Sequence, residues 1–174
     1  MKYDFDISMK RSEIIRYIYY LVIALLLTVL HVSLIDFISI GGITPDLIII
    51  LCVWVSISEG QFIGLFGAFI FGLILDIVTM DVIGTNALSK LFVAFAAGFF
   101  YKEGAERKII GSYKFLLIVL GCSILHNAIY QFFYLKASEA SFIMFFMKYG
   151  IVTAMYTTVF AIFPMLSRIP RKGI

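Results

Sequence analysis

Long apolar runs, separated by short polar or glycine-containing breaks, dominate the pattern of this chain. A helix that crosses a bilayer needs about 20 mostly apolar residues, within a range of about 17–25. Six runs follow one another, and they predict an all-α integral membrane protein with a single six-span domain over residues 1–174. The predicted spans are residues 17–35, 45–58, 61–79, 86–101, 113–135 and 141–167.

The ends of the first two spans carry local signals. Lys10 and Arg11 precede the first span as they would in a signal peptide, but no small-residue cleavage site follows, so we interpret it as a retained helix. Pro45 suits the first turn of the second helix, with Thr44 as its cap. This second span is short, and we expect it to be barely tilted or screened at one end by its neighbours.

Basic residues predict the orientation of the bundle. Cytoplasmic loops of membrane proteins carry an excess of Lys and Arg. Six spans place both termini on the same side, and eleven of the fourteen basic residues fall on that side. Both termini are therefore predicted to be cytoplasmic. The eleven are Lys2, Lys10, Arg11, Arg16, Lys102, Arg107, Lys108, Lys114, Arg168, Arg171 and Lys172.

Composition agrees with the pattern. Hydrophobic residues make up 62% of the 174 residues and charged residues 14%, against roughly 45–50% and 25% in soluble domains. These values exclude a soluble globular enzyme, a disordered chain and a nucleic-acid-binding domain. The two cysteines, Cys52 and Cys122, lie in apolar runs and are interpreted as small buried residues.

Sequence motifs of enzymes are missing. The chain has no phosphate-binding loop, no HExxH, no GxSxG and no CxxC. His31 and His126 lie on different spans without neighbouring ligand residues. We therefore predict a protein that is not an enzyme and that binds no metal or cofactor.

Polar residues within the spans fall in the outer half of the predicted bundle. Such residues are costly in hydrocarbon and usually face the bundle interior, so they indicate an outward polar pocket or docking surface, although some could instead reach to the interface. A buried network is favoured for Asp76, Asn86, Lys90 and Asn127, whereas reaching to the interface is at least equally favoured for Asp36, Asp46 and Lys148. The predicted outer polar network comprises Asp46, Asp76, Asn86, Lys90, His126 and Asn127, with His31 and Gln131 at similar depth.

Two residues of this network are predicted to pair. Asp76 and Lys90 lie about one turn below the outer surface on consecutive antiparallel helices, and each would be costly alone. Asp81, in the loop between these helices, is the rival partner for Lys90.

A ridge of small residues runs along the third predicted span. Gly60, Gly64, Ala68 and Gly72 recur every fourth residue, and Gly67 widens the patch. Such ridges allow two helices to approach closely. The ridge is interpreted as internal packing or, alternatively, as a groove for the helix of a partner.

Spans two to four resemble the MreD family of rod shape-determining proteins, over about residues 43–100. The other spans match that family only in hydropathy, and Lys90 lies outside its pattern. The matching residues are Pro45-Asp46-Leu47, Glu59-Gly60, Gly64, Gly67, Gly72-Leu73, Asp76, Gly84 and Asn86-Ala87-Leu88.

This resemblance implies a function and partners. MreD proteins are non-enzymatic scaffolds of the bacterial elongation complex in the inner membrane, where they bind MreC and help regulate cell shape and lateral peptidoglycan synthesis. MreB and the wall synthases would be indirect or weaker partners, with the lipid bilayer as surroundings. The fold of the family also resembles the S components of energy-coupling-factor transporters. A small-molecule-binding subunit of an importer is therefore the alternative, by analogy of fold alone. The sequence leaves open which helices contact the partner.

Overall fold

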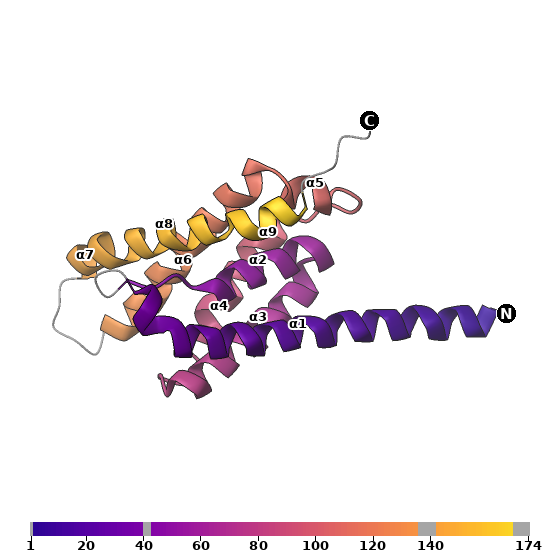
Figure 1. Ribbon diagram of the computed structural model, residues 1–174, viewed down its shortest axis with the longest axis horizontal. Helices are drawn as coiled ribbons and strands as arrows, with labels where there is room; N and C mark the ends of the chain where they lie inside the picture. The colour runs from indigo at the N-terminus through magenta and orange to yellow at the C-terminus, as the bar shows by residue number, and fades with distance from the viewer. Residues whose placement is uncertain (1, 40–42, 136–141, 169–174) are drawn as a thin grey trace.

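The computed structural model describes residues 2–39, 43–135 and 142–168, with side chains described in 12–33, 39, 43–133 and 143–168. These residues form helices and no strand, as predicted (Figure 1). The elements are α1 (Lys2–Ile38), α2 (Leu47–Glu59), α3 (Gln61–Thr79), α4 (Thr85–Gly98), α5 (Glu106–Ile110), α6 (Tyr113–Leu135), α7 (Phe142–Phe145), the π-helix η1 (Phe146–Gly150), α8 (Ile151–Phe160) and α9 (Ile162–Ser167).

Among the described residues, four helical segments are long and apolar enough to cross a membrane: Ser12–Ser33, Gln61–Thr79, Tyr113–Phe133 and Ile143–Ser167. The chain is therefore an all-α protein with the features of an integral membrane protein. Helices α2 and α4, which correspond to the other two predicted spans, have 13 and 14 residues. At 1.5 Å per residue they reach only about 20 Å.

The start of α2 differs from the prediction. The helix begins at Leu47, after Pro45 rather than at it, and its cap is Asp46 rather than Thr44. One carboxylate oxygen of Asp46 accepts hydrogen bonds from the backbone N–H groups of Ile48 and Ile49, at 2.9 and 3.1 Å. A carboxylate is a favourable cap because it satisfies free N–H groups and complements the positive end of the helix dipole.

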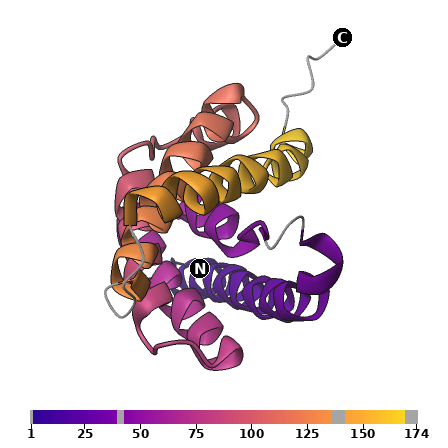
Figure 2. The same cartoon turned by 90° about the vertical axis from the view of Figure 1, so that its left-hand side faces the viewer.

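Helix α2 lies at the centre of the bundle. Nine of its thirteen residues are buried, and it packs against α3, α4, α6 and α1. Helices α3 and α4 form the most extensive contact between two elements, and α8 packs on α6. Helix α1 lies along one side of the bundle, as the end view shows (Figure 2).

The small-residue ridge of α3 faces inward. A Cβ atom on Gly64 would lie 2.8 Å from the Cα of Ser56 on α2, and one on Gly72 would lie 2.5 Å from the Cα of Ala87 on α4. Gly60 and Ala68 are also buried. Of the alternatives left open for this ridge, internal packing therefore holds for these four residues. Gly67 is half-exposed and lies beside the ring of Phe71.

Candidate functional site

A buried ion pair connects the start of α2 to α4. The ammonium of Lys90 lies 2.7 Å from the second carboxylate oxygen of Asp46, and the Lys90 side chain is fully buried. The same ammonium donates to the side-chain oxygen of Asn86 at 3.0 Å. Helix α4 thus supplies both Lys90 and a second acceptor, one turn apart on the same face.

The predicted Asp76–Lys90 pair is wrong, and so is the rival Asp81–Lys90 pair. The described residues hold no ion pair between Lys90 and either of these carboxylates; Lys90 binds Asp46 instead. The prediction compared only neighbours along the chain, whereas Asp46 stands 44 positions away. Reaching to the interface is also the wrong interpretation for Asp46, because its side chain is only 13% exposed.

Asp76 has a different partner, the backbone at the start of α4. Its carboxylate accepts from the N–H groups of Gly84, Asn86 and Ala87, at 2.8, 3.1 and 3.3 Å. Those N–H groups have no partner within the helix, and Asp76 itself is fully buried. Asp76 therefore caps α4 from α3, and this contact joins the C-terminal end of α3 to the N-terminal end of α4.

The loop carboxylate Asp81 belongs to the same group of buried and half-buried polar side chains. This group, the polar cluster, comprises Asp46, Asp76, Asp81, Asn86, Lys90, His126 and Tyr130. Asp81 accepts a hydrogen bond from the Asn86 amide at 3.4 Å and a short one from the Tyr130 hydroxyl on α6. Asn86 therefore connects Lys90 to Asp81, because its amide group accepts from one and donates to the other.

Helix α6 contributes His126, whose Nε2 lies 3.5 Å from the carboxylate of Asp46. Its ring stacks on that of Tyr130, with centroids 5.8 Å apart. Within the described residues, Nδ1 of His126 lacks a hydrogen-bond partner, as do the side-chain oxygens of Ser123 and Gln131 on the same helix. His126 and Tyr130 form the α6 side of the cluster.

Asn127 forms a hydrogen bond away from this cluster, to the π-helix η1. Its amide donates at 2.7 Å to the backbone oxygen of Gly150, the last residue of the π-helix η1. A π-helix displaces the regular hydrogen bonds of an α-helix. Asn127 therefore satisfies a backbone acceptor between α6 and α8 and does not touch Lys90.

The remaining polar candidates lie outside this cluster. Lys148 is exposed, with its ammonium 5.2 Å from the ring centroid of Tyr149. His31 on α1 is half-buried. The side chain of Asp36 lies outside the described residues. No group of three His, Cys, Asp or Glu side chains in the described part of the chain could hold a metal ion.

Two grooves formed by the described residues flank α1, and of the predicted small-residue ridge only Gly67 lies in one of them. The α1–α3 groove has a volume of about 420 Å³ and contains the half-exposed Gly67. Its lining is Tyr17, Ile18, Tyr20, Leu21, Val55, Ile63, Phe66, Gly67, Ile70 and Phe71.

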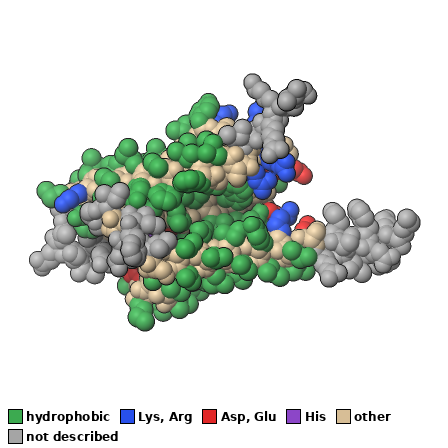
Figure 3. All heavy atoms as spheres, in the orientation of Figure 1, with side chains coloured by type: hydrophobic (Ala, Val, Ile, Leu, Met, Phe, Trp, Pro, Cys, Tyr) green, Lys and Arg blue, Asp and Glu red, His purple; other side chains and the backbone are tan. Residues whose placement is uncertain are grey.

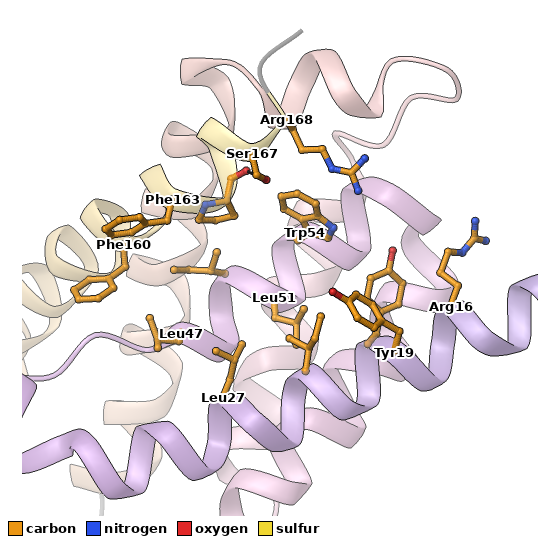
Figure 4. A pocket seen from close by; sticks show the side chains of 14 residues that line it. Arg16, Tyr19, Leu27, Leu47, Leu51, Trp54, Phe160, Phe163, Ser167 and Arg168 are labelled. Carbon is orange, nitrogen blue, oxygen red and sulfur yellow. Dashed lines mark hydrogen bonds between the residues drawn. The ribbon is translucent and has the colours of Figure 1, made fainter. Parts of the chain in front are cut away.

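The α1–α9 groove lies on the other side of α1 and has a volume of about 610 Å³ (Figure 4). Helix α2 forms its floor, and α8 and α9 form its second wall. Its lining is Arg16, Tyr19, Tyr20, Ile23, Leu27, Leu47, Ile50, Leu51, Trp54, Phe160, Phe163, Pro164, Ser167 and Arg168. Such a groove cannot be recognised from the sequence, because each of the distant segments that line it shows only an apolar pattern.

Comparison with known proteins identifies no relative of the chain: no protein-family model, no curated protein and no solved structure matches it.

Proposed function

We propose that this chain is an MreD-type membrane scaffold of the bacterial elongation complex. It binds the single membrane-spanning helix of MreC and so helps to regulate cell shape and lateral peptidoglycan synthesis, without catalysis of its own. Contacts with MreB and the wall synthases are indirect. The family resemblance over residues 43–100 motivates this proposal.

The α1–α3 groove is the observation that carries it. Helices in a bilayer associate through close packing, and small residues allow that packing. Of the small residues on α3, Gly67 alone combines partial exposure with a place in a described groove. The lining is apolar apart from the two tyrosines, Tyr17 and Tyr20, so it suits an apolar partner helix.

The polar cluster favours the scaffold over an importer subunit. A solute-binding subunit of the S-component type needs an open polar cavity, but here protein side chains occupy the cluster. Lys90 and Asp76 are fully buried and His126 is 3% exposed. The cluster therefore holds helices together, and an analogy of fold with S components would not by itself imply a transport function.

Copurification from mild detergent tests the partnership. Gly67→Leu places a bulky side chain in the α1–α3 groove, beside Phe71 and Val55. We expect this variant to recover about tenfold less MreC, since a loss of about 1.4 kcal/mol lowers affinity by that factor. Gly121→Leu is the matched control, because nothing lies within 4 Å of a Cβ atom on Gly121. Equal recovery of MreC by the two variants would place the interface elsewhere, and no recovery by the unchanged protein would end the proposal.

The proposed arrangement places six spans in the inner membrane with both termini in the cytoplasm, with α2 and α4 as the short crossings. Lys and Arg side chains gather at one end of the molecule, which fits a cytoplasmic end (Figure 3). Val82 and Glu103 are exposed residues in the loops after α3 and α4. A membrane-impermeant thiol reagent added to intact cells should label Val82→Cys and leave Glu103→Cys unlabelled. Both native cysteines are buried, which keeps the background low, and the reverse pattern would invert the orientation.

A further inference from the structure

The lining of the α1–α9 groove changes from polar to apolar in the same direction on all three of its sides. Helix α1 places Arg16 at one end of the groove and Leu27 at the other. On α2, Trp54 lies toward the same end of the groove as Arg16, and Leu47 lies toward the other end. On the third side, Arg168 after α9 lies toward the first end and Phe160 on α8 toward the other (Figure 4). The groove is therefore amphipathic along its length, with a cationic end and an apolar end.

The cationic end carries two arginines, and among the described residues only one of them pairs with a carboxylate. Arg16 pairs with Glu59 at 2.7 Å, and Tyr20 donates to the same carboxylate at 2.9 Å. Arg168 has no carboxylate partner among the described residues, and its guanidinium lies 5.1 Å from the ring centroid of Trp54, at the floor of the groove. An arginine guanidinium presents several N–H donors that match the oxygens of a phosphate.

The length of the groove fits one layer of acyl chains. Arg16 and Leu27 stand eleven positions apart on α1, a rise of about 16 Å at 1.5 Å per residue. The hydrocarbon core of a bilayer is about 30 Å thick, so one leaflet occupies about 15 Å of it. A helix that spans the membrane needs roughly twice the length of this groove.

We propose that the α1–α9 groove binds one anionic glycerophospholipid, with its phosphate at Arg168 and its acyl chains against Leu27, Leu47 and Phe160. Basic pockets between membrane helices are known to bind anionic headgroups. The lipid fills the space that separates α1 from α8 and α9, and so supports α1 on the side that faces these two helices.

Native mass spectrometry of the full chain tests this site. The protein is released from a detergent micelle after incubation with phosphatidylglycerol or with phosphatidylcholine of the same acyl chains. We expect one phosphatidylglycerol to remain bound, with at least about a tenfold preference over phosphatidylcholine. Equal retention of the two lipids would overturn the proposal without any variant.

Two pairs of variants locate the site. Arg168→Gln should remove most of the preference, whereas Arg107→Gln, which makes the same charge change on exposed α5, should keep it. Leu27→Trp should block the apolar end and abolish retention. Leu26→Trp, on the 57% exposed neighbouring position outside the groove, should retain the lipid. Equal effects within either pair would place the lipid elsewhere, and a partner helix that crosslinks to Phe163 in the presence of lipid would show that a protein occupies the groove.

Discussion

Helices α1 and α2 are both apolar, but they are held in different ways. Nine of the thirteen residues of α2 are buried, whereas among residues 12–33 of α1 only Ala24 and Thr28 are buried. Polar contacts and close backbone approaches surround α2: Asp46 caps it and binds Lys90, and Ser56 fills the space opposite Gly64. A peripheral contact, Arg16 with Glu59, ties α1 to the bundle. We infer that the inner helices determine stability and that α1 provides the surfaces for binding.

The largest effect is expected when one partner of the inner ion pair is removed. Lys90→Ala leaves the Asp46 carboxylate uncompensated, which should lower the free energy of unfolding by about 3–5 kcal/mol. The measurement is a denaturant titration of the protein in detergent. The double variant Asp46→Asn, Lys90→Met keeps a capping oxygen at position 46 and should lose less than Lys90→Ala. Asp46→Asn and Lys90→Met are also measured separately, and if their two losses add up to the loss of the double variant, the pair is not coupled.

A bulky residue on α3 should have a different effect on folding at a buried position than at a half-exposed one. Gly72→Leu forces a side chain into the backbone of Ala87, where even a Cβ atom would be 2.5 Å away. Overpacking typically costs about 1–3 kcal/mol and sometimes more, so this variant should yield little folded protein. Gly67→Leu should yield folded protein at the level of the unchanged chain. Gel filtration in detergent makes the comparison, and equal yields would mean that α3 and α4 can separate at no cost.

Loss of the cap that α3 provides to α4 should have a smaller effect. Asp76→Ala leaves the N–H groups of Gly84, Asn86 and Ala87 without their acceptor. Loss of a helix cap costs about 0.5–2 kcal/mol. Hydrogen exchange should accelerate at these three amides and stay slow at the middle of α2. Asp76→Asn retains one acceptor oxygen, so its exchange rates at these amides should lie between those of the unchanged protein and those of Asp76→Ala. Unchanged exchange in Asp76→Ala would contradict the capping role.

The smallest effect is expected at the attachment of α1. Arg16 is 48% exposed, and ion pairs of such residues contribute about 0–1 kcal/mol. Arg16→Gln should therefore leave the free energy of unfolding nearly unchanged and increase the spread of spin-label distances between α1 and α3. High salt should have the same effect in the unchanged protein, because salt screens exposed charges. A loss comparable to that of Lys90→Ala would place α1 among the inner helices.

Glycine and tyrosine positions show why sequence reasoning reached some contacts and missed others. The periodic glycines of α3 predicted close packing, but only the structure shows that Gly64 faces α2 and Gly72 faces α4. Tyr20 and Glu59 stand 39 positions apart, and only the structure shows that the Tyr20 hydroxyl donates to Glu59. The chemistry of a side chain follows from its residue type, whereas the residue that it contacts depends on how distant helices pack together.

Hydropathy by itself determined the membrane class and the ranges of α3 and α6, because apolar length and backbone satisfaction in lipid are local properties. Predicted spans 61–79 and 113–135 coincide with α3 and α6. The tertiary structure decided that Lys90 binds Asp46, that Asp76 caps α4 and that two grooves flank α1. These features depend on the rotation and separation of packed helices. A buried charge accepts whichever partner the packing brings within reach, even one 44 positions away.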